Sequence, residues 1–152
     1  ETNFNNDPEA AEILLRSGIP LKLVPAEITF NAFLHKSSIE RIRAKGTPLT
    51  RALTEMSDIF HELISPGLVA WGISADYISD MHVLLHDPLA LSVVLNPAFL
   101  EFKSMKISLL RDKNGKLYMS FDFEGEYEIE VAIKADYAGF ETFLVERILQ
   151  IQ

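Results

Sequence analysis

The chain has 152 residues, no cysteine and a formal net charge of −8 at pH 7. The absence of cysteine excludes disulfides, thiolate metal sites and a cysteine nucleophile, and a reducing cytoplasmic location fits it best. Scattered cations in an acidic chain disfavour nucleic acid as a partner, and no apolar run is long enough to cross a membrane.

The first predicted helix covers residues 7–16 and carries a broad apolar stripe. Asp7 before Pro8 is typical of an N-cap followed by the first helical residue, and Gly18 is typical of a helix end. Residues 19–24 are nearly all apolar and lie between prolines, which predicts a strand covered on both faces of a parallel sheet. A helix followed by such a strand indicates the α/β class.

Two further helices are predicted in the middle of the chain. Residues 37–40 read Ser-Ser-Ile-Glu, a capping box that opens a short helix ending at Gly46. Thr47 before Pro48 opens the next helix, which we expect to run to about Ile64. We interpret both helices as scaffold.

Residues 65–81 show no lasting hydrophobic period and contain Pro66 and two glycines, which predicts a loop or a broken helix. Its large aromatic residues, Trp71 and Tyr77, have two interpretations that the sequence leaves open. They are either core anchors or parts of a mobile lid whose aromatic ring stacks on a flat ligand.

The run His86-Asp87-Pro88-Leu89-Ala90 joins an imidazole, a carboxylate and a helix start. Asp87 is predicted as the N-cap, where the helix dipole favours a fixed, ionised carboxylate of the kind that calcium requires. His86 beside it can exchange a proton near neutral pH, although capping alone also explains the pair. The spacing from His82 suggests a helical zinc site, but a residue before proline avoids the α region, so we discount zinc.

After Pro97 the periodicity becomes that of strands. Residues 106–111 and 117–123 alternate around an Asn-Gly turn, which predicts a hairpin. Residues 126–134 predict a strand with one solvated face, and Asp136 is predicted to cap the last helix. We interpret the acidic row near this strand as solvated rather than metal-binding. Its members are Asp122, Glu124, Glu126, Glu128 and Glu130.

Several separated motifs resemble those of nucleoside hydrolases of the inosine-uridine preferring family. Residues 1–3 and 7–11 resemble the family's ribose-binding Glu-x-Asn and its Asp-Pro-Glu-Ala-Ala segment, and residues 86–90 resemble its His-Asp-Pro-Leu-Ala segment. Between them, Val24-Pro25 and Thr29 match a Val-Pro-x-x-x-Thr strand end. The resemblance extends over essentially the whole chain. The family's opening aspartate-rich loop has no match here.

The resemblance therefore implies that residues 1–152 are the C-terminal part of a single nucleoside hydrolase domain, whose N-terminal aspartate-rich half is absent from this chain. It implies an α/β fold with an open, mostly parallel sheet flanked by helices and a late antiparallel hairpin. Hydrophobic residues make up 48% of this charged chain, which fits an apolar surface facing the absent half. The implied assembly is a homo-oligomer that contains both halves.

The implied activity is calcium-dependent hydrolysis of the N-glycosidic bond of ribonucleosides to free base and ribose, in nucleoside salvage. Glu1 and Asn3 would bind ribose hydroxyls, Asp87 would bind calcium and ribose, and His86 would donate a proton to the leaving base. Tyr77 is a candidate base contact. The preference between purines and pyrimidines stays open. The alternative is a non-catalytic binding or structural subunit that kept the fold but lacks the metal loop.

Overall fold

A computed structural model of the chain describes residues 2–70, 72–121 and 124–151. The chain divides into two compact units, one formed by Glu1–Ile28 with Leu100–Ala135, and the other by Thr29–Phe99 with Asp136–Gln152. Among the described residues, no helix is long and apolar enough to cross a lipid bilayer.

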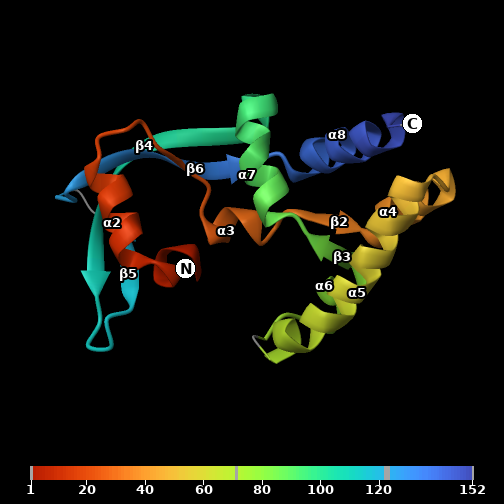
Figure 1. The fold of residues 1–152 in the computed structure, drawn as a ribbon, viewed down its shortest axis with the longest axis horizontal. Helices are drawn as coiled ribbons and strands as arrows, with labels where there is room; N and C mark the ends of the chain where they lie inside the picture. The colour runs from red at the N-terminus through yellow and green to blue at the C-terminus, as the bar shows by residue number, and fades with distance from the viewer. Residues whose placement is uncertain (1, 71, 122–123, 152) are drawn as a thin grey trace. The chain divides into compact units, whose positions relative to one another are not determined.

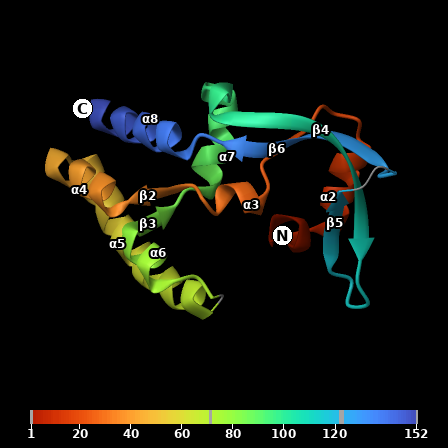
Figure 2. The ribbon, with the colours of Figure 1, turned by 180° about the vertical axis from the view of Figure 1, so that it is seen from behind.

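The first unit consists of two short helices and a sheet (Figures 1 and 2). Its described residues form a four-stranded sheet in the order β1-β6-β4-β5, in which β1 is parallel to β6 and the other neighbours are antiparallel. Side chains from α2 and the sheet form its core, with Leu15, Ile107, Ile129 and Val131 buried. The elements are α1 (Thr2–Asn6), α2 (Pro8–Arg16), β1 (Lys22–Leu23), β4 (Leu100–Arg111), β5 (Leu117–Phe121) and β6 (Tyr127–Ala135).

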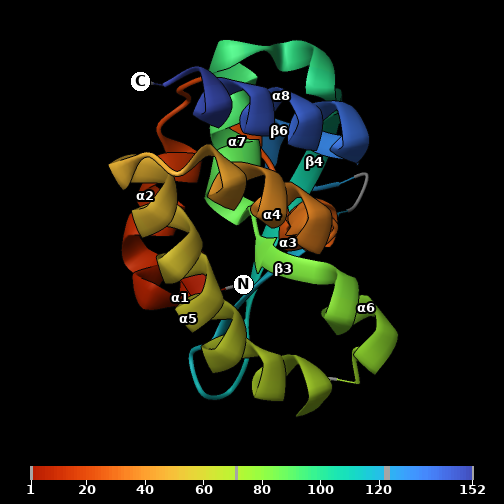
Figure 3. The same cartoon turned by 90° about the vertical axis from the view of Figure 1, so that its right-hand side faces the viewer.

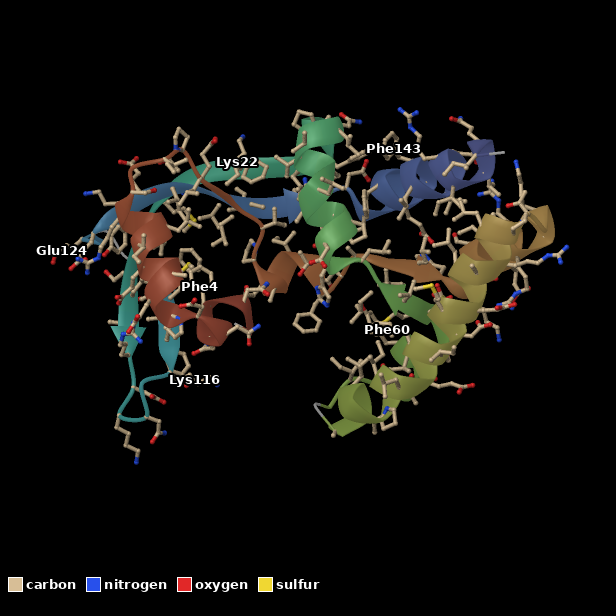
Figure 4. All side chains as sticks on the ribbon, viewed as in Figure 1. Phe4, Lys22, Phe60, Lys116, Glu124 and Phe143 are labelled. Atoms are coloured by element: carbon tan, nitrogen blue, oxygen red, sulfur yellow. The ribbon has the colours of Figure 1, made fainter. Side chains whose placement is uncertain are left out.

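The predicted N-cap of α2 is confirmed, because the Asp7 carboxylate accepts a hydrogen bond of 3.0 Å from the backbone N–H of Ala10. The next predicted strand does pair in parallel, but only over Lys22–Leu23. The expectation that both faces of it are covered is wrong. Lys22 is exposed at the sheet edge, where its ammonium lies 3.1 Å from Glu130 and 4.5 Å above the Phe102 ring (Figure 4).

The predicted hairpin is confirmed by the antiparallel register of β4 and β5. Its turn is closed by the Asp112 carboxylate, which accepts backbone N–H bonds from Asn114 and Lys116, while Gly115 has a φ of 81° that favours glycine. The predicted last strand is β6, and Asp136 caps the helix that follows it. Asp122 lies outside the described residues, and the four glutamates of the acidic row are exposed, as predicted.

The second unit is mainly helical and contains the two-stranded antiparallel pair of β2 and β3 (Figure 1). α4 and α8 lie side by side (Figure 3). α3 (Ala26–Thr29) lies where the chain passes from the first unit to the second. The other elements are β2 (Phe33–His35), α4 (Lys36–Lys45), α5 (Pro48–Ala70), α6 (Ala75–Asp80), β3 (Met81–Leu84), α7 (His86–Leu95), the 3₁₀ turn η1 (Pro97–Phe99) and α8 (Tyr137–Gln150).

α5 is longer than predicted and passes through Pro66. A proline inside a helix removes one backbone hydrogen bond and costs about 3 kcal/mol. The helix continues because Leu68, two residues later, is buried against Ile78 and Met81. The prediction of a loop or broken helix is therefore wrong for residues 65–70, and Trp71 lies outside the described residues.

The predicted capping box at residues 37–40 is wrong, because α4 already begins at Lys36 with His35 as its N-cap. In place of the predicted cap within residues 37–40, the start of α4 is held by a carboxylate from α8. One oxygen of the Glu141 carboxylate accepts the backbone N–H of His35 at 2.8 Å, and the other lies 2.6 Å from its ring Nδ1. Burial works to raise the pKa of Glu141, but hydrogen bonds from Ser38 and His35 lower it below its ordinary value.

Replacing Glu141 with alanine should lower the free energy of unfolding by about 2–3 kcal/mol, because several donors lose a charged acceptor. Glu146→Ala is the matched control, since Glu146 also joins α8 to α4, through an exposed pair with Arg41, and should cost only about 0–1 kcal/mol. Urea unfolding followed by circular dichroism measures both values. Equal losses would contradict the capping role.

The stability that Glu141 contributes should also depend on pH. Because the folded state lowers the pKa of Glu141, its contribution is fully present above the ordinary glutamate pKa. The contribution is lost as the pH falls through the lower, folded-state pKa. The difference in stability between the unchanged chain and Glu141→Ala should therefore shrink in acid.

Candidate functional site

The side chain of His86 is held by a residue from α3. His86 is the first residue of α7, and its ring Nδ1 lies 2.7 Å from the hydroxyl oxygen of Thr29, which is only 5% exposed. The ring of Phe30 meets the imidazole edge to face, with 5.0 Å between the centroids. The imidazole thus has a defined orientation at the start of a helix.

Asp87 is not the N-cap of α7, contrary to the prediction. The N-cap is Leu85, and Asp87 lies in the first helical turn with an exposed side chain. Pro88 is tolerated as the third helical residue because an N–H at that position has no intrahelical partner to lose. Asp87 still lies in the first turn of α7, where the helix dipole favours negative charge.

Tyr77 is attached to the same cluster. Its hydroxyl donates a hydrogen bond of 3.0 Å to the backbone carbonyl of Phe30, and its ring packs against Phe33 at 5.1 Å. Burial, and secondarily Tyr137, raises the pKa of Tyr77, so the hydroxyl keeps its proton. The two interpretations of Tyr77 as anchor and as ligand contact are compatible with this half-buried position.

A largely apolar cavity of about 320 Å³ lies beside Tyr77 and Phe30. Its polar contributors include Asn31 and Ser74, and its other walls come from α5, residues 72–73, α6 and β3. The cavity has room for a flat, partly apolar group. Its other lining residues are Leu68, Gly72, Ile73, Met81 and Leu84.

His82 has a structural role away from His86. It lies on β3, so the two histidines do not share a helical face, as predicted. Its Nε2 is 2.9 Å from the carboxylate of Asp58, which also accepts two hydrogen bonds from Arg43. The Arg43 bonds, supported by His82, lower the pKa of Asp58. The sequence contained no signal for this network, in which His82 also stacks on the ring of His61 at 5.0 Å.

The residues predicted to bind ribose belong to the first unit. Glu1 lies outside the described residues. Asn3 is an exposed residue of α1 and lines a mainly apolar cavity of about 320 Å³, together with Asp7 and Lys22. The structure brings Thr29, Phe30, Tyr77 and His86 together within the second unit, whereas a joint site with Asn3 stays a prediction.

Asp87 is the described residue predicted to bind calcium, so its surroundings can be compared with the oxygen ligands that calcium requires. Calcium takes roughly six to eight oxygen ligands. The exposed Asp87 carboxylate is a donor of the right kind. Among the residues that the structure describes, however, no three His, Asp or Glu side chains gather closely enough to hold a metal ion. The described residues therefore do not form a calcium site by themselves, and Asp87 as a calcium ligand stays a prediction.

Comparisons with known proteins agree with one another. The family model described as inosine-uridine preferring nucleoside hydrolase matches residues 1–142. The pyrimidine-specific ribonucleoside hydrolase RihA of Salmonella typhimurium strain LT2 is 30% identical over 155 residues, which cover 97% of this chain and 46% of the relative. RihA of Salmonella paratyphi A matches with the same identity and coverage. The chain thus spans about half the length of the curated relatives it matches.

Two solved structures resemble the chain. One is a purine-preferring ribonucleoside hydrolase from Gardnerella vaginalis, with a TM-score of 0.75 and 24% identity over 98% of this chain and 46% of that one. The other is a plant nucleoside hydrolase, with a TM-score of 0.81 and 20% identity over 99% of this chain and 48% of that one. At these identities the two structures establish the fold. The predicted α/β class is confirmed, with a mixed sheet in the described part of this chain.

Proposed function

Because this chain belongs to the inosine-uridine preferring nucleoside hydrolase family, we propose that it is the C-terminal part of an enzyme that hydrolyses the N-glycosidic bond of ribonucleosides. The observation that supports the proposal most directly is the oriented imidazole of His86 beside the exposed carboxylate of Asp87. Both residues belong to the His-Asp-Pro-Leu-Ala segment by which the family resemblance was identified.

The proposed roles follow from the charges that the reaction creates. Cleaving the bond between ribose and base builds positive charge on the sugar ring and negative charge on the departing base. His86 would donate a proton to the base, while Phe30 and Tyr77 would contact its flat face. Asp87 would face ribose and serve as a calcium ligand, and Glu1 and Asn3 would bind ribose hydroxyls. Calcium, when bound, would supply Lewis acidity and orient the attacking water.

We further propose that an aspartate-rich N-terminal half completes the site, in a homo-oligomer located in the cytoplasm. Two observations support a covering partner: the matched relatives are about twice as long, and the outer face of α5 is apolar. Met56, Ile59 and Leu63 on that face are 67%, 67% and 75% exposed, and Phe60 beside them is labelled in Figure 4. Exposed side chains of this kind are typical of surfaces that pack against protein.

A second candidate function is a non-catalytic binding or structural subunit with the same fold. The observation that favours it is that, among the described residues, no group of three or more His, Asp or Glu side chains is placed to hold a metal ion. The two candidates differ in what precedes Glu1 in the natural polypeptide. An aspartate-rich loop there favours the enzyme, and its absence favours the second candidate.

The proposal predicts a difference between the fragment and the natural polypeptide that contains it. Residues 1–152 alone should neither bind calcium tightly nor hydrolyse nucleosides, because one carboxylate cannot replace six to eight oxygen ligands. The natural polypeptide should release ribose from nucleosides in the presence of calcium and lose this activity with a chelator. Calorimetry and a reducing-sugar assay measure the two properties. Inosine and uridine should both be tested, because relatives named purine-preferring and pyrimidine-specific both match.

Sub-micromolar calcium binding by residues 1–152 alone would contradict the proposed division of ligands. A natural polypeptide that binds nucleosides without releasing ribose would favour the second candidate function.

A further inference from the structure

The outer face of α5 carries a continuous row of apolar side chains whose spacing alternates between three and four residues. We call this row the α5 seam, and its members are Leu49, Ala52, Met56, Ile59, Leu63, Pro66 and Ala70. Every member is exposed within the second unit. An alternation of this kind, kept over three heptads, is the pattern by which one helix packs along another. The seam therefore predicts a helix as its partner.

The opposite face of α5 already packs against its own unit. Thr50 and Thr54 on that face are 0% and 1% exposed, and Leu68 is buried with Ile78 and Met81. The helix thus buries two threonines inward and presents large apolar side chains outward, which reverses the usual arrangement of a surface helix. A surface of this kind is typical of a face that packs against protein.

We infer that the partner is the α5 seam of a second copy of the polypeptide, with the two helices antiparallel about a two-fold axis. The inference deepens the proposed homo-oligomer and does not depend on the proposed hydrolysis. In this arrangement each seam residue faces a complementary one, and the smallest side chain of a layer faces a large one, so the layers fill evenly. The layers pair Met56 with Ile59, Ala52 with Leu63, and Leu49 with Pro66 of the second copy.

The residues beside the seam favour the antiparallel orientation. One flank is apolar, with Leu53 and Phe60, and the other carries Glu55 and Glu62. Antiparallel helices place like flank on like flank, so Phe60 meets Leu53 of the second copy. Parallel helices would instead place Phe60 against Glu55, and an apolar ring would cover a carboxylate at a cost in desolvation.

The charges on the acidic flank nearly offset one another in the antiparallel pair. Glu62 lies close to both Arg51 and Glu55 of the second copy, so one attraction accompanies one repulsion. Apolar burial therefore drives the association, which should change little with salt. A partner helix with a row of basic residues would bind the glutamates and weaken strongly as salt is added.

The test joins the two copies through cysteines placed in one layer. Ala52→Cys and Leu63→Cys are made in separate samples of the natural polypeptide, one of them tagged, after any cysteine outside residues 1–152 is replaced by serine. In the antiparallel pair these two positions face each other, within reach of a disulfide. Each position lies about 17 Å along the axis from its own copy, because 11 residues separate them. Oxidation should therefore link the mixed sample and neither variant alone.

A second measurement weakens the seam. Ile59→Glu places like charges in the two central layers, and it should raise the dissociation constant of the assembly by roughly 100-fold or more. Sedimentation velocity should then show particles of half the mass. Val69→Glu is the matched control, since Val69 is an exposed apolar residue of the same helix but lies outside the seam. It should leave the mass and the affinity nearly unchanged, and neither measurement should depend strongly on salt.

Disulfides formed by either variant alone would overturn the antiparallel arrangement. The absence of any link in the mixed sample, or an unchanged mass with Ile59→Glu, would show that the seam does not join two copies. A seam covered by the N-terminal half would give no link between copies, and Ile59→Glu would then lower the stability of the monomer. A polypeptide that hydrolyses nucleosides as a monomer would overturn this inference and leave the proposed activity standing.

Discussion

His86→Ala in the natural polypeptide should slow hydrolysis of inosine roughly 10²–10⁴-fold, the range of a general acid. The imidazole is oriented by Thr29 and Phe30 at the start of α7, so a proton donor of defined direction is lost. Calcium binding should remain nearly intact, because the predicted metal ligand is the neighbouring Asp87. Steady-state kinetics and calorimetry measure the two effects separately.

A nitrophenyl riboside is the internal control for the acid role of His86. Its phenolate leaves without a proton, so the loss caused by His86→Ala should shrink on this substrate. The comparison separates proton donation from positioning, since a residue that only positions ribose affects every leaving group alike. Equal losses on inosine, uridine and the nitrophenyl riboside would remove the acid role.

Asp87→Ala should produce the opposite pattern, with turnover damaged on every substrate, including the nitrophenyl riboside. Its exposed carboxylate lies in the first turn of α7, where the helix dipole favours negative charge. Under the proposal that Asp87 is a calcium ligand, we expect calcium affinity to fall by about 100-fold or more in this variant, because affinity depends on the number of charged ligands. Isothermal calorimetry measures the affinity, and kinetics at saturating calcium measures the remaining defect.

Asp76→Ala is the matched control for Asp87, because Asp76 is also an exposed aspartate in the first turn of a helix, α6. It should change neither calcium affinity nor turnover. If Asp87→Ala kept full calcium affinity, the metal role of Asp87 would be refuted. If it impaired uridine but not the nitrophenyl riboside, Asp87 would act on the base rather than on ribose.

The sequence by itself determined the features whose hydrogen bonds close within a few residues. Asp7 and Asp136 cap their helices through N–H groups three residues ahead, and Asp112 closes the hairpin turn through residues two and four positions on. Such contacts depend on local spacing, which a sequence displays directly. The separated motifs also identified the family correctly, because a shared order of short segments is visible without coordinates.

The tertiary structure decided the features that depend on residues distant in the chain. α4 begins at Lys36 because the carboxylate of Glu141, which is 106 residues from His35 in the sequence, accepts the backbone N–H of His35. Local spacing alone predicted that the helix is capped at Ser37. α5 passes Pro66 because Leu68 is buried against residues from α6 and β3.

The site shows the same division between local and distant contacts. The motif identified His86 and Asp87 as candidates. Only the fold brought the hydroxyl of Thr29 to Nδ1 of His86, which is 57 residues away in the sequence. It likewise brought the hydroxyl of Tyr77 to the carbonyl of Phe30, which is 47 residues away. Local periodicity reports which face of an element is apolar, but it contains no information on which distant side chain meets that face. Orientation of the imidazole is therefore a property of the folded chain, whereas its presence beside a carboxylate is a property of the sequence.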